Sequence, residues 1–165
     1  MHPSGSIPQQ SLCRMTMIQK RPSWTDYFNE PSCEILRKNL SDDPASFFDL
    51  ARKNLSGLEG VTEKMKWFGD GWHWTVGYYT PHREEPLVVI IPDPLDLQLA
   101  MPLDRQFIES IPAKEIKKSL REGLELAQAP FDTRWGLWSL DNSGILTDFM
   151  DLVERKLQHL VKIAG

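Results

Sequence analysis

The sequence predicts an α+β domain: an antiparallel β-sheet of about five strands with helices packed on one face, and N- and C-terminal helices flanking it. Segments that alternate with a period of two residues are grouped in the middle of the chain, between 64 and 101. Segments with the helical period of 3.6 residues lie on both sides of them. The connections between the middle segments are too short for parallel crossovers, so antiparallel pairing is expected.

Length and composition are those of one folded domain. The chain has 165 residues, of which 41% are hydrophobic and 25% charged, as in ordinary globular proteins. Residues 1–22 are predicted as a flexible leader and 23–165 as a single α+β domain, with Met15 and Met17 as alternative starts. No stretch in the leader is apolar enough for a signal peptide, and no run approaches the roughly 20 apolar residues that span a bilayer. We therefore expect a cytoplasmic protein with no membrane partner.

Two helices are expected before the sheet. Ser23 is a candidate cap for a short turn, and Pro31 favours a helix that runs to about residue 39. The pair at 43–44, Asp-Pro, favours a second helix to about Leu55, from which Arg52 should point to solvent. The apolar residues expected to face inward are Ile35, Leu36, Leu40, Phe47, Phe48, Leu50, Ala51 and Leu55.

The clearest strand lies at 72–79, where bulky residues alternate with smaller ones. Gly-Asp-Gly at 69–71 tolerates the positive φ of a tight turn, so this strand and 64–68 are predicted to form a hairpin. The β-branched run at 87–91 predicts a central strand. The alternating bulky residues, expected on one buried face, are Trp72, Trp74, Val76 and Tyr78. Further strands are expected at 97–101 and 134–140.

Helical periodicity returns after residue 103. Asp104 is a candidate N-cap for a short helix, and 113–127 is predicted as one longer helix. Its basic residues, expected on a solvated edge, are Lys114, Lys117, Lys118 and Arg121. Asn142 and Ser143 offer caps for a terminal helix. The stripe of that helix is Leu146, Phe149, Met150, Val153, Leu157 and Leu160.

The order of these elements resembles the YdhG-like superfamily of bacterial domains of unknown function. The likeness rests on 61–69 (VTEKMKWFG), the aromatic strand, the strand at 87–92 and the closing strand before a helix, and it covers roughly 23–160. It implies an α+β fold with an antiparallel sheet. Proteins resembling this group have been discussed as frataxin-like iron chaperones, so the resemblance also implies iron, bound by acidic surface residues, as an alternative to a domain without cofactor.

Charge and motifs narrow the function classes. With 19 basic and 23 acidic residues the net charge is −4, which does not favour a nucleic acid partner. Cys13 and Cys33 define neither a disulfide framework nor a zinc site. Phosphate-binding loops, dinucleotide fingerprints and nucleophile elbows are absent from the sequence, which lowers the prior for familiar enzyme classes.

A set of aromatic residues is the first candidate ligand pocket, because rings on a strand face can line a binding site. An alternative, which the apolar helix stripes favour, is that these rings form a core covered by the helices. The set is Trp67, Trp72, Trp74, Tyr78, Trp135 and Trp138.

Carboxylates near two turns are the alternative, metal-binding candidate, since oxygen ligands suit hard cations and ferrous iron. They are Asp93, Asp96, Glu84 and Glu85, with Asp70 at the hairpin. Turn formation is the favoured alternative for these residues, because Asp before Pro commonly initiates a turn and no calcium-loop spacing is present.

Four further residues, His73, His82, His159 and Cys33, are weighed as catalytic groups or surface residues. His73 should point away from the Trp72 and Trp74 face, His159 should meet water, and Cys33 lacks an evident base. The sequence therefore favours a non-catalytic domain, monomer or homodimer, that binds a small molecule or a protein partner. Iron handling and an enzyme of unrecognised class are the alternatives.

Overall fold

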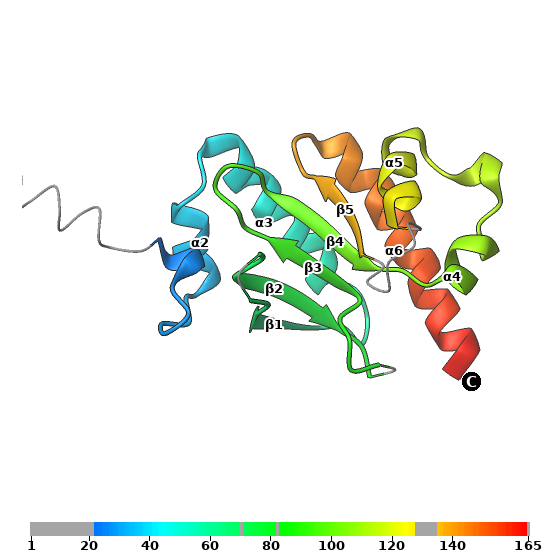
Figure 1. Cartoon of the computed structure of the whole chain (residues 1–165), viewed down its shortest axis with the longest axis horizontal. Coiled ribbons are helices and arrows are strands. Elements are labelled where there is room, and N and C mark those ends of the chain that lie inside the picture. The colour runs from blue at the N-terminus through cyan, green and yellow to red at the C-terminus, as the bar shows by residue number, and fades with distance from the viewer. Residues whose placement is uncertain (1–21, 70, 82, 128–134, 165) are drawn as a thin grey trace, which may run out of the picture.

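The computed structural model describes residues 22–69, 71–81, 83–127 and 135–164, and it shows one sheet with helices on one side (Figure 1). The strands follow chain order, β1-β2-β3-β4-β5, and each pairs antiparallel with the next. They are β1 (Thr62–Trp67), β2 (Trp74–Tyr79), β3 (Val88–Ile91), β4 (Gln98–Pro102) and β5 (Trp135–Ser139). The predicted α+β fold with an antiparallel five-stranded sheet is therefore confirmed.

Helices precede the sheet, interrupt it between β4 and β5, and end the described chain. They are η2 (Ser23–Thr25), α2 (Cys33–Lys38), α3 (Asp42–Ser56), α4 (Arg105–Ser110), η3 (Ala113–Glu115), α5 (Lys118–Ala127) and α6 (Ser143–Ala164). The predicted cap Asp104 accepts from the Phe107 N–H at 2.7 Å, and Asn142 accepts from the Ile145 N–H at 2.9 Å. The helix predicted over 113–127 is broken, because Ile116 adopts an extended backbone between η3 and α5.

The main core lies between one sheet face and helices α3, α5 and α6 (Figure 1). Alternate strand residues point into it, as a strand with one helix-covered face requires. The sheet contributes Val76, Tyr78, Val88, Ile90, Leu99, Met101 and Trp138, and the helices contribute residues such as Phe48, Leu55, Leu124, Phe149 and Val153. Two residues that were expected to face the core, Ile35 and Leu50, are exposed. The core-facing stripes of α2 and α3 are narrower than the sequence pattern indicates.

The central strands of the opposite sheet face are also buried, and aromatic rings pack on them. Val89, Ile91 and Ala100 form a second cluster there, against Trp24, Trp72 and Trp135 (the aromatic face). The prediction that Trp72 and Trp74 share one face is wrong. His73 has φ of 56°, a left-handed conformation that interrupts the alternation, so β2 begins only at Trp74.

Within the described part of the chain, no helix is both long and apolar enough to cross a membrane.

Candidate functional site

The structure divides the predicted aromatic set between two faces of the sheet. Tyr78 and Trp138 belong to the helix-covered core, and the Trp138 indole N–H donates to the Leu120 carbonyl at 3.1 Å. Trp74 is buried beneath the N-terminal segment, where its indole N–H donates to the Asp26 carbonyl at 2.6 Å. These three side chains therefore stabilise the fold.

The other three tryptophans are half-buried and contact further rings. Trp72 and Trp135 meet edge to face with ring centroids 4.8 Å apart, and Phe68 packs on both. Trp67 lies 5.5 Å from the ring of Trp74. Because Trp72 and Trp135 sit on the opposite face from Tyr78 and Trp138, the six residues do not line one common pocket.

The four carboxylates predicted as an alternative metal site lie at opposite ends of β3. Asp93 accepts from the Leu95 N–H and Asp96 accepts from the Ser139 hydroxyl, both at the turn that follows the strand. Glu84 and Glu85 precede the strand, and Glu85 pairs with Arg83 at 2.9 Å. The two pairs therefore cannot share one ion. Nowhere in the described chain do three or more His, Cys, Asp or Glu side chains gather as a metal site would require; Asp70 and His82 lie outside it.

The weighed catalytic residues are not brought together. Cys33 is half-buried, and burial raises the pKa of its thiol, which favours the unreactive protonated form. His73 lies in the β1–β2 turn, with its ring 4.6 Å from that of Trp24. His159 does not simply meet water, because its ring packs 5.3 Å from that of Phe107 and its Nε2 atom is buried.

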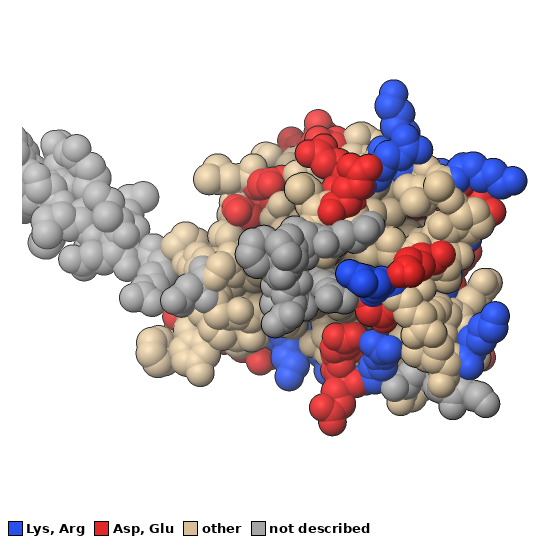
Figure 2. Space-filling view, turned by 45° about the vertical axis from the view of Figure 1, so that its right-hand side comes forward, with Lys and Arg blue, Asp and Glu red and all other residues tan. Residues whose placement is uncertain are grey.

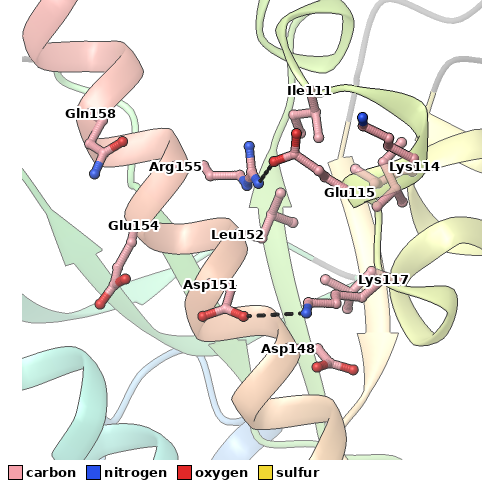
Figure 3. A pocket seen from close by; sticks show the side chains of 13 residues that line it. Ile111, Lys114, Glu115, Lys117, Asp148, Asp151, Leu152, Glu154, Arg155 and Gln158 are labelled. Carbon is pink, nitrogen blue, oxygen red and sulfur yellow. Dashed lines mark hydrogen bonds and ion pairs between the residues drawn. The ribbon is translucent and has the colours of Figure 1, made fainter.

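A groove between α6 and the segment Ile111–Leu124 is the candidate site (Figure 3). Its volume is about 660 Å³, which falls within the range of roughly 300–1,000 Å³ that small-molecule sites occupy. The break between η3 and α5 opens this groove, since a continuous helix would not turn Glu115 and Lys117 toward the same side. The apolar lining is Ile111, Ile116, Leu120, Leu124 and Leu152.

Charged side chains of both signs face one another across the groove. Arg155 of α6 pairs with Glu115 of η3, and Lys117 lies 4.0 Å from Asp151, with Leu152 between the two pairs (Figure 3). Both pairs are solvent-exposed, and such pairs contribute only about 0–1 kcal/mol each to stability. Ligand groups can therefore replace either partner at small cost.

Three charges of the lining stand outside these pairs. Lys114, Asp148 and Glu154 have no ion-pair partner within the residues described, and Glu154 projects from the far side of α6 (Figure 3). Acidic and basic side chains are interspersed over the face shown in Figure 2, and neither sign covers it. The groove thus offers mixed charges rather than a field of one sign.

The sequence indicated only half of this groove. Lys114 and Lys117 belong to the basic edge that was expected to be solvated. The side formed by α6 was missed, although Asp148, Asp151 and Arg155 recur at three and four residue spacing and so share one face of that helix. That spacing could have identified a charged helix face, but not the segment that lies opposite.

A second polar group, half-buried between α3 and the β1 edge of the sheet, was also missed. Arg52 donates two hydrogen bonds to Glu63, at 3.0 and 3.2 Å, so the prediction that Arg52 points to solvent is wrong. The Tyr78 hydroxyl donates to the same carboxylate at 2.6 Å. Burial alone would raise the pKa of Glu63, but these hydrogen bonds outweigh it and leave that pKa below its usual value. The network joins α3, β1 and β2.

Comparison with known proteins adds no relative: no family model, no curated protein and no solved structure matches the chain. The resemblance to the YdhG-like superfamily therefore stays a prediction.

Proposed function

We propose that this protein is a non-catalytic binding domain that takes a small zwitterionic molecule with an apolar body into the groove between α6 and Ile111–Leu124. The observation that supports it is the combination of two exposed, opposite-sign pairs with an apolar lining between them. A ligand with one charge would leave the groove's other sign uncompensated, whereas a zwitterion matches both. The described lining residues include no Cys, His, Ser or Tyr that would serve as nucleophile and base.

Free leucyl-phenylalanine is a suitable probe, because it carries an ammonium, a carboxylate and two apolar side chains. At about 0.3 kcal/mol per non-hydrogen atom, roughly 20 atoms give a dissociation constant on the order of tens of micromolar. When the dipeptide is titrated into the protein, the methyl NMR resonances of Leu124 and Leu152 should shift. The N-acetylated and C-amidated forms and glycylglycine, which lack one charge or the apolar body, should bind at least tenfold more weakly.

Ile116→Lys places a cation in the half-buried lining and should abolish the shifts, whereas Ile35→Lys on exposed α2 should leave them unchanged. The proposal fails if the singly charged forms bind as tightly as the zwitterion, or if Ile116→Lys binds like the parent protein.

A further inference from the structure

The two edges of the sheet differ in their protection against strand pairing. β1 carries Glu63, Lys64 and Lys66, and charged side chains, lysine above all, discourage the addition of another strand. β5 has the sequence WGLWS, with no charge and no proline. Among the described residues its one strand partner is β4. Within the part of the chain that the structure describes, β5 is therefore the less protected edge of this sheet.

The hydrogen-bond register shows which β5 residues face outward. The Leu140 N–H donates to the Leu97 carbonyl at 2.7 Å, so the backbone of Leu140 faces β4. Backbone groups alternate sides along a strand, so Trp135, Leu137 and Ser139 direct their N–H and C=O groups away from β4. Pro102 lies opposite Trp135, where its missing N–H loses no ladder bond.

Side chains on this edge indicate the chemistry of a partner strand. Leu137 is 40% exposed and Trp135 is half-buried, and as alternate residues they share a face. An added strand would place its own apolar residues beside them, where apolar cross-strand pairs stabilise a sheet.

Carboxylates lie beyond the Ser139 end of β5. Leu140 and Asp141 directly follow the strand and line a hollow of about 260 Å³, which Asp43, Asp96 and the almost fully exposed Leu95 also line. None of the three carboxylates forms an ion pair with another described residue. A basic side chain on the partner strand complements this end of the edge.

We propose that β5 binds a partner protein by strand addition, through an extended segment with apolar residues at alternate positions and Lys or Arg at the end beside Asp96 and Asp141. Antiparallel pairing is the more stable arrangement, and it places the basic residues at the N-terminal end of the segment. This surface is separate from the groove on α6, and it does not depend on the proposed function.

The test uses the full chain and the synthetic peptide acetyl-Lys-Arg-Val-Thr-Val-Thr-Val-amide. Binding should slow amide hydrogen exchange at Leu137 and Ser139, the outward-facing donors, and leave β1 unchanged. Replacing the central valine of the peptide by proline removes a backbone donor and should abolish binding. Replacing the Lys-Arg of the peptide by Asp-Glu should weaken binding at least about twofold at low salt. The effect should be smaller at high salt.

Two matched protein variants test whether the peptide binds to the β5 edge or to the β1 edge. Leu137→Lys charges the β5 edge and should weaken peptide binding on the order of tenfold, whereas Thr62→Lys on exposed β1 should not change it. Slowed exchange on β1, equal binding of the proline peptide, or no binding at millimolar peptide would each overturn the proposal. Self-association of the free protein with slowed exchange at Leu137 would also overturn it, since a second copy would then occupy the edge.

Discussion

Trp138 is a residue whose packing depends on the absence of neighbouring side chains. Its indole lies against Gly123 of α5 and Gly136 of β5, and a Cβ at either glycine would fall well inside van der Waals contact of the ring. The indole N–H bond to the Leu120 carbonyl holds the ring in this position. The two glycines therefore allow α5 to approach β5 closely over a buried tryptophan.

We expect Gly123→Ala to destabilise the protein by about 1–3 kcal/mol, because overpacking outweighs the better helix propensity of alanine. Urea unfolding at neutral pH measures the change. Gly71→Ala is the control, since nothing lies within 4 Å of its added Cβ, and it should stay within about 0.5 kcal/mol. In a Trp138→Phe background the cost of Gly123→Ala should shrink; an unchanged cost would show that the indole is not the cause.

Single residues also mark where sequence patterns fail. Alternation predicted Trp72 and Trp74 on one face, and one residue with positive φ, His73, moved Trp72 to the other. Lys156 lies at an apolar-stripe position of α6, three residues after Val153 and four before Leu160, yet a lysine is normally read as exposed. Periodicity gives neither the sign of a residue's φ angle nor the distant group that pairs with a buried charge.

At the scale of elements, the Glu63 network holds the edge strand β1 against α3 and β2. The carboxylate accepts from Arg52, Tyr78 and Ser56, and hydrogen bonds to a charged group contribute about 1.5–3 kcal/mol. We expect Glu63→Gln to lower the free energy of unfolding by about 1–3 kcal/mol at pH 7. Exposed Glu59→Gln should change it by less than about 0.5 kcal/mol.

The effect of Glu63→Gln should depend on pH. The pKa of Glu63 is lowered in the folded state. The carboxylate therefore makes its full contribution to the free energy of unfolding above the pKa of the unfolded chain, about 4.3. This contribution is lost as the pH falls from there through the lowered folded pKa. Urea unfolding of both proteins between about pH 7 and pH 3 should show their difference shrinking in acid. A constant difference would mean that the charge of Glu63 contributes nothing.

Elements with strong local signals were predicted well, and those that depend on distant partners were not. The β1–β2 hairpin and β3 lie within two residues of their predicted bounds, and α6 begins at its predicted cap, because periodicity, turn glycines and caps are local. The break at Ile116 was missed, and with it the groove, because the pairing of Glu115 with Arg155 joins segments 40 residues apart. For the same reason the mixed charges of the candidate site were seen only as a basic edge.

At the scale of the whole molecule, Lys156 connects the helix layer to the sheet and to α4. It is 1% exposed, its ammonium donates to the Pro102 carbonyl at the end of β4, and it lies 5.1 Å from the ring centroid of Phe107. Burial lowers the pKa of Lys156, and the nearby charges of Asp104 and Glu85 only partly oppose this. Folding therefore works against the charged form of this one side chain.

This predicts a pH dependence of global stability on the alkaline side. Between the lowered folded pKa of Lys156 and its ordinary value near 10.4, the unfolded chain binds a proton that the folded chain does not, so stability rises with pH. Tyr78 and Tyr79, whose pKa values burial raises, act in the opposite direction above about pH 10. The parent protein and Lys156→Met both keep the two tyrosines. Subtracting the free energies of unfolding of the two proteins therefore removes the contribution of the tyrosines.

The free energy of unfolding of the parent protein minus that of Lys156→Met should increase between about pH 7 and pH 10.5. The increase is about 1.4 kcal/mol for each unit by which burial lowers the pKa. Urea unfolding at closely spaced pH values measures it, and Gln158→Met on the exposed side of α6 controls for the added methionine. A difference that stays level across this range would show that Lys156 keeps its proton inside the fold, held by the Pro102 carbonyl and the Phe107 ring.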